Sequence, residues 1–377
     1  MRLACNRMSI LAINPGSMSA KLAFFDGRTE VGASEVPWVV RADLRGRAVD
    51  EETDRYFCEI QRLLTSRQWR PGAVAGRGGF IGLGRQRLTA GVYRVAVVRE
   101  GRAEVCADIY RAVTEAPELD HASNYGIPLA ARVALAFNIP AFTVDPIVVD
   151  DFQDLARFSG YAPVERRSLA HVLSVRAMVR KAAAQLGRDF GRGQMVAVHL
   201  GGGITVAAVR DGRIVDTNNA LLGGGPFSPQ RVGSLPMRDL IDLCYGGKFT
   251  KQELQVELTK RGGVFSYLGD DDMQRIEARI AQGDARAVAV VHAMAYQVAK
   301  EIGAMAIAAG GDLAAVVLSG GLCRCEFFLN SLRPRIAHLA PVLVFPGSLE
   351  MEAMAHGVYR VLTGQEEALT YVPKPQA

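Results

Sequence analysis

Long apolar runs are missing from this 377-residue sequence. No stretch approaches about 18 uninterrupted apolar residues, so we expect no transmembrane helix. The opening residues, MRLACNRMSILAIN, have neither a long apolar core nor a small-residue cleavage site, so we expect no secretory signal. These absences predict a cytoplasmic protein that does not work at a membrane.

Strong charge and cysteine patterns are missing too. The net charge is only +5 and no run of five or more Lys and Arg occurs, so nucleic acid is not an expected partner. The six cysteines are scattered, and the Cys323–Cys325 pair has no second pair at the spacing of a zinc site. Reduced structural cysteines in a cytosolic protein are the simplest interpretation.

Two similar glycine-centred segments are present, one in each half of the chain. In ILAINPGSMSAKLAFFDGRTEV and MVAVHLGGGITVAAVRDGRIVD, an apolar strand meets a glycine turn, a second strand follows, and Asp-Gly returns the chain. The spacing agrees, because Gly16 to Gly27 and Gly201 to Gly212 are both 11 residues. Further along, AVAGRGG and AVVLSGG are both apolar strands that end in two glycines. This duplication predicts two related α/β lobes with a ligand in the cleft between them. A single doubly wound domain is the alternative.

Apolar spacing predicts the other elements. Helical periodicity predicts helices at 51–67, 123–137, 237–244, 272–281, 285–309, 326–338 and 350–362. Short apolar runs predict strands at 10–13, 21–25, 31–36, 73–77, 141–144 and 342–345.

The turn NPGSMSAK has the features of a phosphate-binding loop. Gly16 permits a tight turn with exposed backbone amides, the serines add hydroxyl donors, and Lys21 adds a positive charge. Asn14 can reach a metal or a metal-bound water through its side-chain oxygen. The Gly-Lys-Ser/Thr ending of a Walker loop is absent, so an ordinary hairpin is the alternative. In HLGGGIT three consecutive glycines are costly to order, which makes sense where backbone approaches a ligand closely.

Basic and acidic side chains accompany these turns. Arg77 in GRGG and Arg231 in SPQRVGSLP carry guanidinium groups, whose fork suits a carboxylate or a phosphoryl group. His121 and His171 lie where helices are expected to begin. Asp145 ends an apolar strand, where a carboxylate is well placed for Mg²⁺ or its waters. Taken singly, each histidine is more often structural, and surface charge is the alternative for each arginine.

Together these segments resemble the acetate and butyrate kinase family of the actin-like phosphotransferases, over about residues 9–362. NPGSMSAK resembles the family's N-x-G-S-x-S-x-K loop, and DHASNYG, TVDPIVVDDF, RRSLAH, VHLGGGIT and NNALLGGGPFSPQRVGSLP resemble its butyrate kinase branch. The resemblance implies two duplicated actin-like (ribonuclease H-like) α/β lobes with a central nucleotide cleft. One lobe would span 1–160, closed by a C-terminal helix at 353–377, and the other, nucleotide-binding lobe would span 161–352.

The resemblance also implies a reaction. The enzyme would use ATP and Mg²⁺ to phosphorylate a short-chain fatty acid carboxylate such as butanoate, giving an acyl phosphate and ADP, reversibly. A homodimer is implied as well. A fatty carboxylate is already ionised at neutral pH, so no strong general base is needed. The obstacle is to bring one anion against another, and arginines, Mg²⁺, histidine donors and amide-lined turns overcome it.

Roles follow from the same resemblance, residue by residue. The catalytic groups would be Arg77, His121, Asp145, His171 and Arg231. The nucleotide and phosphate groups would be Ser17, Ser19, Lys21, Gly201, Gly202, Gly203, Asp272, Gly320 and Gly321. The metal would be held by Asn14 and Glu352. Two registers stay open, because Asp270 and Asp271 compete with Asp272, and Glu350 competes with Glu352.

One departure from the family pattern bears on the substrate. Ala170 precedes His171 where the family usually carries a large aromatic residue. A smaller wall predicts an acyl pocket suited to four carbons or more, branched acids included. Chain length, branching and physiological direction stay open on the sequence, as do acetate and propionate as substrates. A sugar or polyol kinase of the same broad fold, which would need a catalytic Asp as base, is a second alternative. An actin-like ATP-binding regulator without phosphotransfer is a third.

Overall fold

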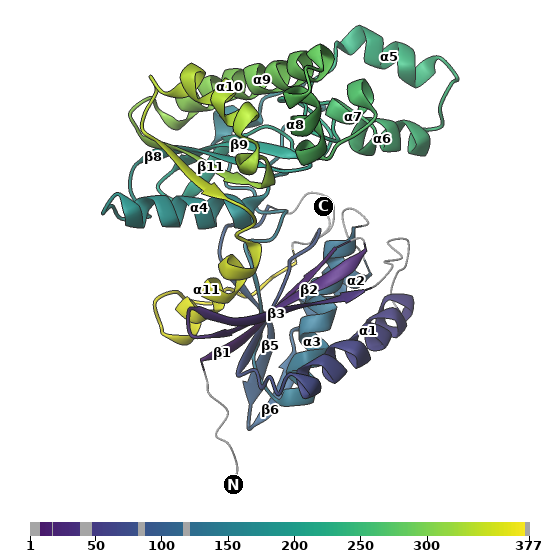
Figure 1. Ribbon diagram of the computed structural model, residues 1–377. Helices are drawn as coiled ribbons and strands as arrows, with labels where there is room; N and C mark the ends of the chain where they lie inside the picture. Colours follow the sequence, from purple (N-terminus) through teal and green to yellow (C-terminus); the bar gives the residue numbers. More distant parts are fainter. Residues whose placement is uncertain (1–7, 17, 38–46, 82–86, 116–120, 374–377) are drawn as a thin grey trace. The chain divides into compact units, whose positions relative to one another are not determined.

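The computed structural model describes residues 8–16, 18–37, 47–81, 87–115 and 121–373, which form two compact units (Figure 1). The first unit combines Met1–Val149 with Glu350–Ala377, and the second is Asp150–Leu349. The sequence analysis placed the corresponding boundaries at residues 160 and 352. The chain thus leaves the first unit once and returns to it for its last helix.

The first unit is built on a seven-stranded sheet of order β3-β2-β1-β4-β7-β5-β6. Its strands are β1 (Ser9–Pro15), β2 (Ser19–Asp26), β3 (Thr29–Pro37), β4 (Ala73–Gly76), β5 (Val92–Arg99), β6 (Arg102–Val105) and β7 (Ala141–Val144). Its helices are α1 (Arg47–Ser66), α2 (Ala107–Thr114), the short 3₁₀ turn η1 (Ala122–Tyr125), α3 (Gly126–Phe137) and α11 (Glu350–Leu362). Figure 1 shows α11 on one face of the sheet and α3, backed by α1, on the other. Helices on both faces explain why β1 and β4 are almost entirely apolar and buried.

The second unit is built on a five-stranded sheet of order β10-β9-β8-β11-β12. Its strands are β8 (Gln194–Leu200), β9 (Ile204–Arg210), β10 (Arg213–Thr217), β11 (Leu313–Gly320) and β12 (Val342–Pro346). Its helices are η2 (Asp154–Arg157), α4 (Val172–Gln185), α5 (Met237–Tyr245), α6 (Lys251–Lys260), α7 (Gly263–Leu268), α8 (Met273–Ala281), α9 (Ala285–Ala309), η3 (Gly321–Arg324) and α10 (Glu326–Ile336). Helix α4 covers one face of the sheet, while α9, with α10 beside it, covers the other (Figure 1).

The two sheets repeat one topology. In each, two antiparallel pairings join three consecutive strands, and the first of these strands pairs in parallel with a later strand that ends in glycine. The order β3-β2-β1-β4-β7 therefore corresponds to β10-β9-β8-β11-β12. This confirms the prediction of two related α/β lobes and excludes a single doubly wound domain. The hairpin of β5 and β6 and the helices α2, α6 and α7 had no counterpart in the sequence prediction.

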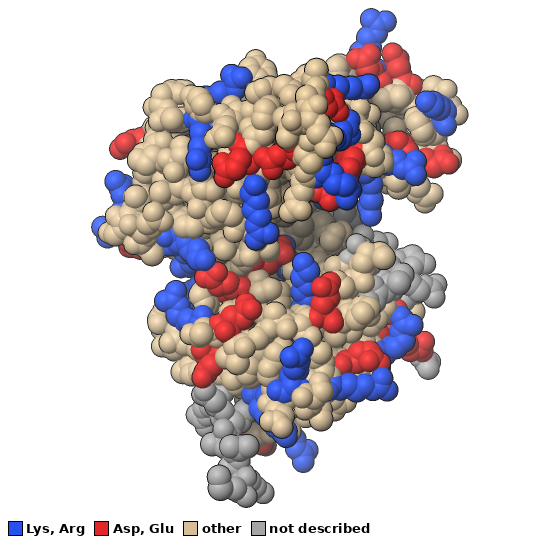
Figure 2. Space-filling view, in the orientation of Figure 1, with Lys and Arg blue, Asp and Glu red and all other residues tan. Residues whose placement is uncertain are grey.

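Charge is mixed over the surface. On the face shown in Figure 2, basic and acidic side chains are interspersed over each unit. Within the described ranges, no helix combines the length and the apolarity needed to cross a bilayer.

Close packing at the end of β4 yields a first prediction. A Cβ on Gly76 would lie 2.0 Å from the carbonyl oxygen of Gly126, at the start of α3, and 2.9 Å from the Cβ of Ala130. We expect Gly76→Ala to lower the free energy of unfolding by about 3 kcal/mol, the upper end of ordinary overpacking. Urea denaturation measures it. The matched control is Gly303→Ala in α9, where a Cβ meets nothing within 4 Å; this change should be neutral or stabilising by up to about 1 kcal/mol. Equal unfolding midpoints for the two variants would contradict the packing account.

Candidate active site

The first glycine turn places Asn14 beside a glutamate from the other end of the chain. Asn14, near the end of β1, donates from Nδ2 to Oε2 of Glu350 at 2.8 Å, across 336 residues of sequence. Gly16 closes the turn by donating its amide to the carbonyl of Ser19 at 2.8 Å. Lys21 lies opposite Asn14 in the β1–β2 register and is exposed. The Ser19 hydroxyl donates to Glu35. Ser17, also predicted for this loop, lies outside the described residues.

Arg77 meets the same glutamate. It follows β4 directly, its side chain is 9% exposed, and its Nη1 lies 2.9 Å from Oε1 of Glu350. The approach has ion-pair distance, but Nη1 makes no hydrogen bond of acceptable geometry. A buried guanidinium that is paired yet incompletely hydrogen-bonded keeps capacity for a second anion. Glu350 therefore joins Asn14 and Arg77 into one cluster at the ends of β1 and β4.

Of the two rival glutamates predicted for the metal, Glu350 has the printed contacts with Asn14 and Arg77, while the metal role of Glu352 stays a prediction. Glu352 lies one helical turn before His356, with its Oε1 3.7 Å from the Nδ1 of that histidine. Both glutamates stand in the first turn of α11, but residues two apart on a helix point to different sides. The structure brings Glu350 to Asn14 and Arg77.

The segment DHASN lies against the turn that follows Arg77. The side-chain oxygen of Asn124 accepts from the amide of Phe80 at 2.8 Å, and a Cβ on Gly79 would lie 2.6 Å from the Cα of Asn124. His121 is exposed, makes a 2.9 Å contact with the Ser123 hydroxyl through Nδ1, and presents its ring edge to Phe80 at 5.7 Å. The structure thus brings His121 to the Arg77 turn. The sequence analysis missed Asn124, although the DHASNYG motif contains it.

Asp145 has a turn-anchoring role in the structure. It is 6% exposed, has a φ of 43°, and accepts from the Gly91 amide at 2.8 Å, while its own amide donates to the Gly91 carbonyl. The candidate metal site depends on few protein ligands. In the described part of the chain, no three His, Cys, Asp or Glu side chains gather closely enough to hold a metal by themselves. Kinase Mg²⁺ sites usually have only one or two carboxylates, with waters and substrate phosphates completing the coordination. The oxygens of Glu350 and Asn14 fit that kind of site.

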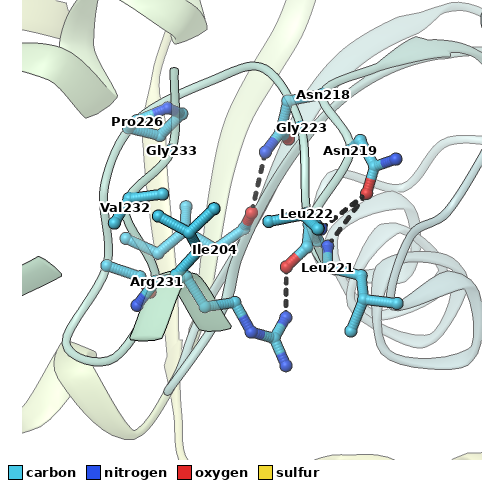
Figure 3. A pocket seen from close by; sticks show the side chains of 13 residues that line it. Ile204, Asn218, Asn219, Leu221, Leu222, Gly223, Pro226, Arg231, Val232 and Gly233 are labelled. Carbon is cyan, nitrogen blue, oxygen red and sulfur yellow. Dashed lines mark hydrogen bonds between the residues drawn. The ribbon is translucent and has the colours of Figure 1, made fainter. Parts of the chain in front are cut away.

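Arg231, in the second unit, is a half-buried cation without an acidic partner. Its Nη1 donates to the carbonyl of Ala220, and its Nε has no hydrogen-bond partner among the described residues (Figure 3). No carboxylate in the described ranges pairs with it, and burial lowers the pKa of its guanidinium. A partly desolvated charge is costly unless something neutralises it, so a site of this kind suits an incoming anion.

The third glycine of HLGGGIT makes room for this arginine. A Cβ on Gly203 would lie 2.1 Å from Nη1 of Arg231. The Ser228 hydroxyl ties the two loops together, donating to the carbonyl of Gly202 at 2.6 Å and accepting from the Arg231 amide at 3.1 Å. Beside the arginine lies a cavity of about 10 Å³, lined by Asn218, Leu222 and Val232 among others (Figure 3). The absence of a side chain at Gly203 therefore leaves the space that the Arg231 guanidinium occupies.

His171 lies near the same turn. It precedes α4, its Nδ1 contacts the Thr205 hydroxyl at 2.8 Å, and its amide donates to the same oxygen at 3.3 Å. The ring of His199, the residue before the last of β8, lies 4.4 Å from it between centroids. The contact from Thr205 fixes the orientation of the His171 ring. Sequence reasoning did not single out His199 or Thr205, although both belong to the HLGGGIT motif.

The Gly320–Gly321 turn is tight on one side and open on the other. Gly320 has a φ of 107°, and a Cβ there would lie 2.2 Å from the carbonyl oxygen of Leu200. A Cβ on Gly321 would meet nothing within 4 Å, and a Cβ on Gly201 would meet His199 at 3.2 Å. The packing at Gly320 requires glycine, while the space beside Gly321 is open.

The three consecutive aspartates before α8 have different partners. Asp272 caps α8, accepting from the amides of Gln274 and Arg275. Asp270 pairs with Arg275 at 2.7 Å, and these hydrogen bonds hold the pKa of Asp270 well below its usual range. Asp271 alone reaches the segment that carries Arg231, accepting from Gln230 at 2.6 Å. Asp272 thus caps α8 in this structure, and its nucleotide role stays a prediction, while Asp271 is the acid that contacts the segment carrying Arg231.

Comparisons with known proteins agree on one family. Residues 163–332 match the model of the acetokinase family. A "Probable butyrate kinase" of Listeria monocytogenes serotype 4b is 40% identical over 365 residues, covering 96% of this chain and 99% of the relative. "Butyrate kinase 2" of Clostridium acetobutylicum is 34% identical over 368 residues, covering 97% of this chain and 99% of that one.

Solved structures agree on the fold. The acetate kinase of Porphyromonas gingivalis superposes with a TM-score of 0.73 at 17% identity, over 94% of this chain and 99% of that chain. A propionate kinase of Francisella tularensis superposes with a TM-score of 0.70 at 17% identity, over 93% and 98%. At this identity the likeness concerns the actin-like fold alone. The relatives match nearly the whole chain at 34% to 40% identity, and the two repeated sheets agree with them. The chain therefore belongs to the acetokinase family.

Proposed function

We propose that this protein is a short-chain fatty acid kinase that transfers the γ-phosphoryl group of ATP to a carboxylate, with butyrate as the first candidate acid. The observation that carries the proposal is Arg231, a half-buried guanidinium held in place by backbone, with no acidic partner among the described residues. A substrate carboxylate or a transferring phosphoryl group would supply the missing negative charge. The names of the Listeria and Clostridium relatives favour butyrate.

The chemistry asks little of the protein beyond positioning and charge. The acid arrives ionised, so one carboxylate oxygen attacks the γ-phosphorus while ADP leaves, and no proton has to be removed. Arg77 and Arg231 offset the negative charge on the two anions, and His171, oriented by Thr205, donates toward the transferring group. Mg²⁺, held by Glu350 and Asn14, would neutralise charge on the phosphates. Water must be kept from the phosphoryl group, so we expect the enzyme to close over its substrates.

The turns would divide the nucleotide between them. Backbone amides around Gly201 and Gly202, with Ser19 and Lys21 of the first loop, would contact phosphates, and the open side of Gly321 would face the nucleoside. We also propose that the enzyme works in the cytoplasm and as a homodimer. Because acyl phosphates are high-energy compounds, the same site can run toward ATP.

Trapping the acyl phosphate with hydroxylamine tests the proposal against its alternatives. ATP, Mg²⁺ and a series of fatty acids should give acyl hydroxamate. A sugar or polyol kinase would give none with acids but would phosphorylate a hydroxyl substrate. A regulator without phosphotransfer would give no product with any acceptor, and that result would overturn the proposal.

Ala170 yields a prediction about the acid. This residue is 1% exposed and directly precedes His171. Because its side chain is small, we expect kcat/KM to be higher for butyrate, isobutyrate or isovalerate than for acetate. Ala170→Phe should shift the ratio toward acetate by roughly 10-fold or more, as a pocket loses room for one or two methylenes. Steady-state kinetics over the series from acetate to isovalerate measures it. Fastest turnover of acetate by the wild-type enzyme would sink the interpretation of Ala170.

A further inference from the structure

Thr205, the second residue of β9, directs both contacts of its hydroxyl to one residue, His171. The Thr205 side chain is fully buried, at 0% exposure. Its oxygen accepts from the amide of His171 at 3.3 Å and lies 2.8 Å from the Nδ1 of the same residue. One hydroxyl thus meets both the backbone and the ring of a residue that the proposed reaction uses.

Strand pairing and packing hold this hydroxyl in place. Thr205 lies opposite His199 in the antiparallel register of β8 and β9, and His171 directly precedes α4, which packs on β8 and β11. Threonine is branched at Cβ, so its χ1 angle has little freedom. The ring of His199 lies 4.4 Å from that of His171 between centroids, with 32° between their planes. Groups fixed on β8 and β9 therefore contact the His171 ring.

The hydroxyl of Thr205 has one hydrogen to donate. A threonine hydroxyl can donate once and accept twice. The His171 amide uses one acceptor site, and within the described ranges the two atoms of His171 are the hydroxyl's only hydrogen-bond contacts. Because the side chain is fully buried, bulk water supplies no acceptor. Nδ1 of His171 is therefore the acceptor that this hydrogen can reach.

The position of the ring hydrogen follows from this geometry. If Nδ1 carried a hydrogen, Nδ1 would donate to the Thr205 oxygen, and the hydroxyl hydrogen would be buried without an acceptor. A buried donor without a partner is disfavoured by roughly 5- to 150-fold. A neutral imidazole carries a single hydrogen, so an Nδ1 that accepts places this hydrogen on Nε2. The imidazolium form, which carries a hydrogen on both nitrogens, meets the same penalty.

We propose that Thr205 is a positioning residue that holds His171 as a neutral imidazole with its hydrogen on Nε2. The hydrogen bond at one ring nitrogen sets which nitrogen carries the hydrogen. Since Thr205 engages Nδ1, Nε2 is the nitrogen that would meet the transferring phosphoryl group, and it would meet that anion as a donor. With the hydrogen on Nδ1, the lone pair of Nε2 would face phosphate oxygens and repel them. The inference rests on the function proposed above, because it specifies how His171 donates.

This assignment distinguishes His171 from an acid catalyst. The fatty carboxylate is ionised before it attacks, and no proton has to move during transfer, so a donor that keeps its hydrogen is sufficient. A donor that is already oriented toward the developing charge costs no reorganisation at the moment of reaction. Thr205 contributes to that orientation through His171, without itself contacting the reacting atoms.

Nitrogen NMR of the full chain, labelled with nitrogen-15 in its histidine rings, tests the proposal without any substrate. At a pH of about 8 an ordinary imidazole is neutral, and the two ring nitrogens give distinct signals according to which one carries the hydrogen. His171→Gln identifies the relevant signals by their loss among those of the six histidines. We expect Nε2–H for His171, and the ratio of Nε2–H to Nδ1–H should fall about 5-fold or more in Thr205→Val. A hydrogen on Nδ1 in the wild type, or an unchanged ratio in Thr205→Val, would overturn the proposal.

Kinetics gives a second readout. Thr205→Val keeps the shape of the side chain and removes the hydroxyl, so kcat should fall about 10-fold, less than the roughly 100-fold expected when His171→Ala removes the donor itself. KM for ATP and for butyrate should stay within about threefold, because the hydroxyl acts through His171. Thr205→Ser keeps a hydroxyl at the same place and should recover most of the loss, and it keeps the proposal testable if Thr205→Val fails to fold.

Thr53→Val is the matched control. Thr53 in α1 of the first unit is also 0% exposed, and its hydroxyl donates to the carbonyl of Val49 at 2.7 Å. Its replacement removes a comparable buried hydroxyl and should leave kcat and the His171 signals unchanged. Wild-type kcat in Thr205→Val, or an equal loss in Thr205→Ser, would contradict the positioning role. If the wild type phosphorylates no acid, the proposed function fails, while the NMR result still decides which nitrogen of His171 carries the hydrogen.

Discussion

Replacing Arg231 with glutamine is expected to lower kcat for acyl phosphate formation by about 10³-fold or more, the range found for single arginines in phosphoryl transfer. No carboxylate in the described ranges pairs with the Arg231 guanidinium, so its charge is available to the reacting anions. Arg231→Lys should recover little of the loss, because a lysine offers a point charge in place of a planar fork.

The control and the rescue separate this role from a structural one. Arg213→Gln removes an exposed guanidinium from β10 of the same unit and should leave kcat within about twofold, as surface changes usually do. Added guanidinium ion should partly restore Arg231→Ala, since the missing charge can be supplied from solution. If Arg231→Gln kept near-normal kcat while losing stability, the arginine would be structural.

The second large effect concerns Glu350. We expect Glu350→Gln to lower kcat by about 10²-fold or more and to raise the Mg²⁺ concentration needed for half-maximal rate, because it removes a carboxylate that the metal and Arg77 would share. The variant should also lose about 1 to 3 kcal/mol in free energy of unfolding, since Arg77 stays nearly buried without its countercharge. Rates measured as a function of free Mg²⁺ check the first point.

Glu352→Gln is the matched control in the same helical turn. Glu352 is 35% exposed, and its Oε1 lies 3.7 Å from Nδ1 of His356. Its replacement should leave the Mg²⁺ dependence unchanged. A larger effect from Glu352→Gln than from Glu350→Gln would support Glu352, the residue predicted from the sequence, as the metal ligand.

The fold could be predicted from the sequence because short local patterns reveal its duplication. Paired apolar strands, glycine turns at equal spacing and Asp-Gly returns are all short-range features, and each half carries them. The β5–β6 hairpin was missed, although Glu100 and Gly101 form its turn with positive φ. Its role became visible only through the sheet, where β5 pairs with β7 and also with the C-terminal segment at Leu369.

The site was harder to predict where the chain returns from far away. Nothing local distinguishes Glu350 from Glu352, because both are acidic, both start α11, and only the packing of that helix on the first sheet selects one. The same applies to Asp270, Asp271 and Asp272, whose partners are set by the start of α8 and by Gln230. The reason for glycine at position 203 could not be predicted either, because Arg231, which a Cβ there would contact, lies 28 residues further along the chain.

Phosphorus NMR of butyrate with ATP and Mg²⁺ tests the central claim most directly. The account predicts that an acyl phosphate resonance grows in step with that of ADP, and that it disappears in Arg231→Gln under the same conditions. Release of inorganic phosphate and ADP from ATP, with no acyl phosphate from butyrate or from any other short-chain acid, would contradict it.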